Sequence, residues 1–334
     1  MALGLGFVAM LVSALVPSAI VAAATAPALL VLWLAVAADS RPEPPRVVLI
    51  AFVLGALSVI PVGLLELWLK HNVPITHNPW LAVDVSTLFF VGIPEETFKI
   101  SIIVAIALRA RDFDEPMDGV VYGAAVGLGF AALENVLHLV RAGTFWEIIA
   151  IVRGVLSVPF HGALGAIAGA YIARARFGGA LNVHSRWRRP RLFLLAWLIP
   201  VALHSLFDAS LFSIPHAKGH TAAVLLLSQT ALIAGFGAIA FAVLLARRIT
   251  RHQKLWLQTK RLPPAHWRGV WAECLIGVGL SFVALTLGIA GSSGVKMAGW
   301  ALLVGALGIS WKCGRYLKQV AINRHRSATT ASTS

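Results

Sequence analysis

The sequence predicts an all-α membrane protein, a polytopic bundle of about nine transmembrane helices, with eight to ten as the range. Apolar residues make up 58% of the 334 positions and charged residues only 13%, a balance that would leave a water-soluble domain short of charged surface. A hydrocarbon core about 30 Å thick needs roughly 20 apolar residues per helix. Such runs follow one another along the chain, whereas the strands of a membrane barrel are about half as long.

Nine apolar segments follow one another without a soluble domain between them. They cover residues 4–38, 47–69, 81–108, 118–140, 148–173, 191–213, 221–246, 270–290 and 295–311. The first segment contains Pro17 and Pro27, so it forms either one bent helix or two short ones. No Lys or Arg precedes Arg41, which favours a retained anchor over a cleaved signal peptide. We expect one integral membrane domain over residues 1–326, with its motif-bearing core at about 47–213 and a disordered cytoplasmic tail at 327–334.

The net charge of +14 reports topology rather than nucleic-acid binding, which would require the basic residues to form one patch. Of the 28 Lys and Arg residues, 22 lie in alternate connections, at residues 39–46, 109–117, 174–191 and 247–268 and in the tail from 312. The positive-inside rule places these connections and the carboxyl terminus in the cytoplasm. We therefore predict a multi-pass protein of a bacterial-type plasma membrane, with the lipid bilayer as its partner and no nucleic acid.

The third segment carries three charged residues about midway along its length, in the sequence Gly92-Ile-Pro-Glu95-Glu96-Thr-Phe-Lys99. An ionisable side chain at bilayer depth costs about 2.5 to 3.5 kcal/mol, so each needs a partner, a cavity or a function. Pro94 predicts a break that starts a second half-helix, whose free N–H groups would face the carboxylates. Glu95 and Lys99 are spaced to pair on one face, with Glu96 roughly 100° away. The motif therefore predicts one held carboxylate and one free carboxylate.

The next three segments each add polar groups at overlapping depths. Glu134 lies in the fourth segment and His161 in the fifth, and both segments have stripes of Gly residues that allow close helix packing. In the sixth segment, His204 and Asp208 are one turn apart, so that the carboxylate can orient the imidazole. Any one of these residues has an ordinary structural explanation, as an interhelical hydrogen bond or an ion pair. Their occurrence together on four successive segments predicts a functional site.

The residue types favour hydrolysis. Two imidazoles and a carboxylate can supply three ligands to Zn²⁺, and a further carboxylate can act as general base toward water. The soluble H-E-x-x-H signature is absent, and no Ser or Cys lies in an evident nucleophile motif, so a covalent mechanism has little support.

Three ordered motifs carry a family resemblance. These are Glu95-Glu96-Thr-Phe-Lys99 (E-E-x-x-K), Phe130 to Glu134 (F-x-x-x-E) and His204 to Asp208 (H-x-x-x-D), preceded by the Pro- and Glu-rich residues 41–45. Over residues 25–213 the chain resembles the PrsW-type intramembrane metalloproteases, which are related to the CAAX prenyl protease superfamily. An F-x-x-x-H motif is expected at His161, but position 157 is Ser and Phe160 directly precedes the histidine.

The resemblance implies an intramembrane peptidase that cleaves membrane-anchored protein substrates, with a single-span anti-sigma factor as the model. It implies a catalytic core of four residues assisted by three others, and the residue types of that core favour a zinc ion held by three of its members. The core is Glu95, Glu96, His161 and His204, the assisting residues are Lys99, Glu134 and Asp208, and the metal ligands are Glu96, His161 and His204. A metal-free mechanism with a glutamate that activates water stays open as an alternative.

Two other functions also fit parts of the pattern. An ion-coupled transporter would use a broken helix and midplane carboxylates as well, although no inverted repeat is visible between the halves of the chain. A non-catalytic membrane scaffold would keep the same residues for packing.

Overall fold

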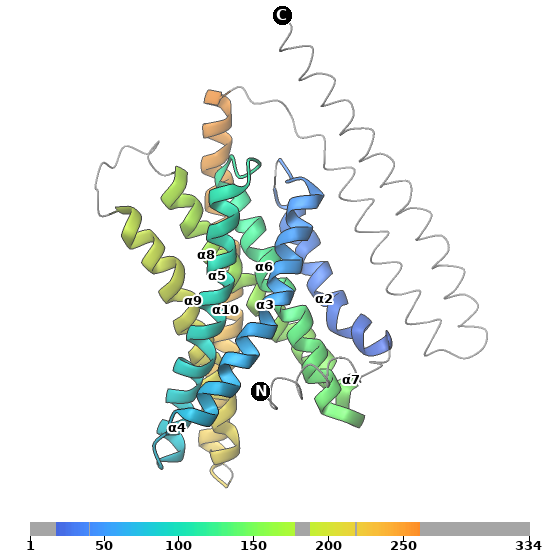
Figure 1. Cartoon of the computed structure of the whole chain (residues 1–334), viewed down its shortest axis with the longest axis vertical. Coiled ribbons are helices and arrows are strands. Elements are labelled where there is room, and N and C mark those ends of the chain that lie inside the picture. The colour runs from blue at the N-terminus through green and yellow to red at the C-terminus, as the bar shows by residue number, and fades with distance from the viewer. Residues whose placement is uncertain (1–17, 40, 178–187, 218, 261–334) are drawn as a thin grey trace, which may run out of the picture.

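The computed structural model describes residues 18–39, 41–177, 188–217 and 219–260, and these ranges form helices without any strand (Figure 1). In chain order the elements are α2 (Ser18–Ala37), α3 (Pro45–Asn72), α4 (Pro79–Ser86), η1 (Thr87–Gly92), α5 (Ile93–Arg109), α6 (Pro116–Ala142), η2 (Gly143–Phe145), α7 (Trp146–Val152), η3 (Arg153–Ser157), α8 (Val158–Phe177), α9 (Arg188–Ser213), η5 (Ile214–Ala217) and α10 (Thr221–Lys260). The predicted all-α class is therefore confirmed for the described part of the chain.

The second to seventh predicted segments and residues 18–38 of the first coincide with these helices, and the last two segments, at 270–290 and 295–311, lie outside the described residues. So do residues 1–17, which decide whether the first segment is one helix or two, and the tail. Within the described residues, five stretches are long and apolar enough to cross a membrane: Ile20–Ala37, Pro45–Asn72, Pro116–Phe177, Arg189–Ala217 and Thr221–Arg251. The third segment is not among them, which is consistent with the three charged residues in its middle.

Helix α6 is the centre of the bundle and packs against α2, α3 and α8. Its glycines allow the closest approach, because a Cβ added at Gly123 would collide with the backbone carbonyl of Gly165 on α8. One turn on, a Cβ at Gly127 would collide with the carbonyl of His161. The predicted glycine stripes are thus confirmed as the contact between α6 and α8, and they fix the depth of His161 relative to α6.

The outer surface of the bundle is apolar. Large exposed side chains such as Leu57 on α3, Phe193 on α9 and Ile233 on α10 face away from the interior. The interior instead holds small residues together with charged side chains such as Glu96 and Lys99, which are fully buried. Such a distribution suits lipid, because an apolar surface costs nothing there and buried polar groups need partners inside the protein.

Two π-helical turns precede the helices that carry the candidate site. η1 ends directly before Ile93-Pro94 at the start of α5, and η3 ends directly before Val158-Pro159 at the start of α8. A proline cannot donate the usual helical hydrogen bond and crowds the carbonyl four residues earlier, and a wider π turn accommodates both effects. The predicted break with free N–H groups before Glu95 is therefore wrong. The backbone stays helical through Gly92, and the N–H of Ile93 donates to the carbonyl of Leu88.

Candidate active site

Eight polar side chains from α5, α6, α8, α9 and the η3 turn meet inside the bundle. We call them the central cluster: Glu95, Glu96, Lys99, Glu134, Arg153, His161, His204 and Asp208. Five of its members, Glu95, Glu96, Lys99, His161 and His204, are at most 5% exposed. All seven residues predicted from the sequence belong to this cluster, so the sequence motifs do converge in space.

Lys99 lies between the two carboxylates of its own helix. Its Nζ is 3.2 Å from Oε2 of Glu95 and 2.7 Å from Oε1 of Glu96. The prediction of one held and one free carboxylate is therefore wrong, because residues three and four positions before a lysine both lie within its reach on a helix. Lys99 Nζ is also 3.2 Å from Nδ1 of His161. An ammonium can only donate, so this nitrogen accepts and the proton of His161 is on Nε2.

The two carboxylates of the motif differ in how firmly they are held. Oε1 of Glu96 accepts from Nδ1 of His204 at 2.8 Å in addition to its contact with Lys99. Among the described residues, Glu95 makes only the 3.2 Å contact with Lys99 and a 3.8 Å contact with Nε2 of His204. The same Nε2 lies 3.5 Å from Oδ2 of Asp208, the arrangement expected for a carboxylate that orients an imidazole.

The sequence analysis did not include Arg153 among the candidate site residues. In the structure, Arg153 lies in η3 and its guanidinium is 2.7 Å from Oε2 of Glu134. The same carboxylate oxygen is 3.1 Å from Nε2 of His161, and the other oxygen is 3.2 Å from His138. Glu134 thus links an arginine and two histidines. The signal was available, because Arg153 falls inside an apolar segment where a charge needs a partner.

Aromatic rings close the cluster on one side. The His161 and His204 rings lie edge to face with centroids 5.0 Å apart, and the Phe160 ring contacts both. Phe130 lies beneath Lys99, whose Nζ is 4.1 Å from the ring centroid. These contacts hold the imidazoles and the ammonium in fixed positions and keep the surroundings apolar.

The central cluster fits a divalent metal ion in its donor types. Glu95, Glu96, His161 and His204 each offer a ligand atom within 4.8 Å of the others, and two imidazoles with carboxylates are typical zinc ligands. Oε2 of Glu96 is buried and has no hydrogen-bond partner in the part of the chain that the structure describes, which leaves a ligand atom available. In the described residues the cluster's four carboxylates face only two fixed cations, Lys99 and Arg153. A divalent cation would balance this charge.

A second buried group of acidic residues joins the connection after α2 to the start of α6. We call it the loop cluster: Asp39, Arg41, Glu43, Asp114, Glu115, Asp118 and Tyr122. Here too, ligand atoms of Asp39, Glu43, Glu115 and Asp118 lie within 4.8 Å of one another. Along α6, Asp118 and Glu134 are about 24 Å apart, so the two clusters lie at different depths.

Most contacts of the loop cluster have a structural role. Glu115 and Asp118 form a capping box at the start of α6, in which Oδ2 of Asp118 accepts from the backbone N–H groups of Asp114 and Glu115 at 2.7 Å. Arg41 pairs with Glu115 at 3.1 Å. Capping satisfies backbone donors that a helix terminus leaves free, so the cluster fastens the preceding connection to α6. Nothing in the sequence analysis predicted it.

The fold and the central cluster define a class: an integral membrane protein with a buried Glu and His site of hydrolytic type. A family model described as PrsW family intramembrane metalloprotease matches residues 43–236, more than half of the chain. The chain therefore belongs to the PrsW family of intramembrane metalloproteases. The resemblance was predicted over residues 25–213. The matched range begins later than residue 25, and at its other end it extends past residue 213 into α10.

Comparison with individual relatives gives the same result. The chain is 30% identical over 189 residues to a protein named Protease PrsW from Oceanobacillus iheyensis, covering 57% of this chain and 81% of the relative. It is 35% identical over 167 residues to the Bacillus subtilis protein of that name, covering 50% of this chain and 70% of the relative. No solved structure matches. The chain is thus a membrane-embedded peptidase, and an ion-coupled transporter is not favoured.

Proposed function

We propose that the central cluster is the active site and that it hydrolyses peptide bonds of membrane-anchored proteins within the bilayer. The observation that carries this proposal is the convergence of Glu95, Glu96, His161 and His204 within 4.8 Å on three helices of an otherwise apolar bundle. Lipid offers no other reason for such groups at this depth, and membership in the peptidase family supplies the reaction class.

The distances suggest different roles for the two glutamates. Glu96 is held at 2.7 and 2.8 Å by Lys99 and His204 and keeps one oxygen without a partner, which suits a fixed ligand. Together with His161 and His204 it would hold a zinc ion, which when bound lowers the pKa of water and polarises a carbonyl. Glu95, whose contacts are longer, suits the general base.

The reaction then runs through Glu95. Its carboxylate takes a proton from water as the water oxygen bonds to the scissile carbonyl carbon. Glu95 returns that proton to the amide nitrogen as the carbon–nitrogen bond breaks, which releases an amine and a carboxylic acid. Lys99, 3.2 Å from Glu95, keeps the carboxylate oriented between the two transfers.

The remaining members of the cluster act as positioning residues. Glu134, itself fixed by Arg153, accepts a hydrogen bond from Nε2 of His161 at 3.1 Å, so the nitrogen that would bind a metal is Nδ1, which accepts from Lys99 in this structure. Asp208 lies 3.5 Å from Nε2 of His204 and orients that ring, whose Nδ1 donates to Glu96. Carboxylates in this position set the tautomer and the basicity of a ligating imidazole.

The expected substrates are proteins with a membrane anchor, of which single-span anti-sigma factors are one candidate class. The proposal further includes one domain over residues 1–326 with its core at about 47–213, nine spans in a bacterial-type plasma membrane, and a cytoplasmic carboxyl terminus. The basic connections support this orientation. A protease accessibility assay on tags at the two termini of the intact protein would test it.

Cleavage assays of single variants test the assignment. The full chain would be reconstituted in liposomes with a panel of tagged single-span reporter proteins, and cleavage would be followed on gels. Glu95→Gln, Glu96→Gln, His161→Ala and His204→Ala should each lower the cleavage rate by at least about a hundredfold, with normal membrane insertion. Asp84→Asn, an exposed carboxylate change on α4, should leave the rate unchanged. Wild-type rates in all four cluster variants would refute the proposal.

A further inference from the structure

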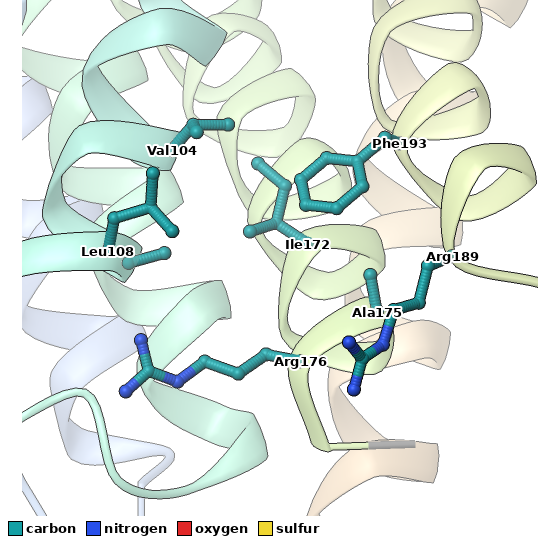
Figure 2. A pocket seen from close by; sticks show the side chains of 8 residues that line it. Val104, Leu108, Ile172, Ala175, Arg176, Arg189 and Phe193 are labelled. Carbon is teal, nitrogen blue, oxygen red and sulfur yellow. The ribbon is translucent and has the colours of Figure 1, made fainter. Parts of the chain in front are cut away.

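A hollow with apolar walls and two arginines lies between α5, α8 and α9 (Figure 2), and none of its lining residues belongs to the central cluster. Its volume is about 300 Å³. Its lining residues belong to the C-terminal parts of α5 and α8 and to the N-terminal part of α9. On α9, Phe193 in its wall is eleven residues from His204, or about 16 Å along the helix.

The walls are apolar and face the surroundings of the bundle. Val104 and Leu108 of α5, Ile172 of α8 and Phe193 of α9 line the hollow, and Figure 2 shows Val104 and Leu108 on the side opposite Phe193. Leu108 is 76% exposed and Phe193 is 42% exposed. In a membrane protein, such exposed apolar side chains face lipid tails, so the hollow opens toward the bilayer.

Two guanidinium groups lie at one end of these walls, from Arg176 on α8 and Arg189 on α9 (Figure 2). Among the described residues neither arginine forms an ion pair. Arg176 instead lies over the Phe113 ring, with 5.0 Å between its Cζ and the ring centroid. The position of Arg176 is therefore set by an aromatic contact, and its hydrogen-bond donors remain available to an anion.

We propose that this hollow binds one anionic phospholipid of the bilayer, with its phosphate between Arg176 and Arg189 and an acyl chain along Val104, Leu108 and Phe193. Charge complementarity selects the anionic head group, and the adjoining apolar walls select a ligand with a chain. A free phosphate would use the arginines alone. Basic pockets between transmembrane helices at the cytoplasmic face are suited to such head groups.

The lipid would connect the three helices that carry most of the central cluster. α5 carries Glu95, Glu96 and Lys99, α8 carries His161 and α9 carries His204. A ligand that contacts all three at their other ends limits how far they can separate. Lipid binding itself does not depend on the proposed catalytic roles, and it can be measured without any substrate.

Lipid titration of the full chain tests the proposal. The protein would be purified in an uncharged detergent and titrated with phosphatidylglycerol and, separately, with phosphatidylcholine, and bound lipid would be counted by native mass spectrometry. One phosphatidylglycerol should bind in preference to phosphatidylcholine. Arg176→Gln and Arg189→Gln should each weaken phosphatidylglycerol binding about fivefold, and the double variant roughly 25-fold.

Two further variants distinguish the contribution of the two arginines to lipid binding from that of the apolar walls. Arg174→Gln removes a guanidinium of the same helix that lies over Tyr171 and does not line the hollow, so it should bind lipid as the wild type does. Phe193→Ala keeps both arginines and should weaken binding about tenfold through lost apolar contact. Size-exclusion elution would show that each variant is folded.

Four results would overturn the proposal. The first is equal binding of the two lipids, and the second is an unchanged affinity in the double arginine variant. The third is a loss in Arg174→Gln as large as that in Arg176→Gln, which would indicate nonspecific charge attraction. The fourth is displacement of the lipid by millimolar inorganic phosphate together with wild-type affinity in Phe193→Ala, which would identify a site for free phosphate.

Discussion

The central cluster and the loop cluster are alike in how closely their potential ligand atoms approach one another, and they differ in what their side chains bind. Each brings four potential ligand atoms within 4.8 Å of one another in a buried environment. In the loop cluster, the carboxylates of Glu115 and Asp118 are used to cap α6. In the central cluster, the carboxylates and imidazoles contact one another and Lys99. A buried group that combines imidazole and carboxylate ligands, none of which caps a helix, therefore indicates an active site more strongly than a group of neighbouring carboxylates does.

The largest expected difference between the two clusters is in metal binding. Purified wild-type protein should contain about one zinc ion per chain, and chelation should abolish its peptidase activity until zinc is returned. A variant with His161→Ala and His204→Ala should contain no zinc, whereas one with Glu43→Gln and Glu115→Gln should contain as much as the wild type. Elemental analysis measures both. Zinc that is lost only from the second variant would assign the ion to the loop cluster.

The next largest effect is expected for Lys99→Met. This change leaves Glu95 and Glu96 buried without their shared cation, which should lower the free energy of unfolding by about 3 to 5 kcal/mol. The matched change Lys70→Met breaks the 3.5 Å pair of Lys70 with Glu66, where Lys70 is 51% exposed, and should cost less than about 1 kcal/mol. Denaturant unfolding in detergent compares the two. Equal losses would mean that Lys99 does not neutralise the carboxylates.

A smaller effect is expected in the loop cluster for Tyr122→Phe. The Tyr122 hydroxyl donates to Glu43, and both side chains are buried. Removing the hydroxyl should lower the free energy of unfolding by about 1 to 3 kcal/mol while cleavage continues at the wild-type rate. Tyr171→Phe, on the neighbouring α8, is the matched control and should change neither. A large loss of activity in Tyr122→Phe would contradict a purely structural loop cluster.

An effect of a different kind, a pH dependence of stability, is expected in the loop cluster. Burial raises the pKa of Glu43 and of Glu115 from 4.5 to about 8. Between these values the folded protein holds protons that the unfolded chain has released, so the free energy of unfolding should fall as the pH rises from about 4.5 to about 8. Thermal melts across this range would measure the slope. Glu115→Gln should flatten it, and a change of the exposed carboxylate in Glu147→Gln should not.

The sequence was sufficient to predict the described helices and seven of the eight members of the central cluster. Apolar runs of about 20 residues leave few alternatives to spanning helices. Glu95, Glu134, His161 and His204 stand out because charged or polar residues within such runs need a reason. The glycine stripes likewise predicted the close contact of α6 with α8.

What the sequence could not supply were features that depend on long-range contacts or on local backbone detail. Arg41 meets Glu115 across 74 positions, and no periodicity predicts such a pairing. Pro94 was expected to break the third segment, whereas a π turn absorbs it, because helices have more than one way to accommodate a proline. The double pairing of Lys99 follows from side-chain rotamers, which spacing alone does not determine.

The most direct test of the central claim compares cleavage of one single-span reporter by two matched double variants in liposomes. His161→Ala with His204→Ala removes the imidazoles of the central cluster, and Glu43→Gln with Glu115→Gln alters the loop cluster. We expect the first variant to insert normally and cleave nothing, and the second to cleave within about threefold of the wild-type rate. Cleavage by the first variant, or its loss only in the second, would show that the active site is not the central cluster.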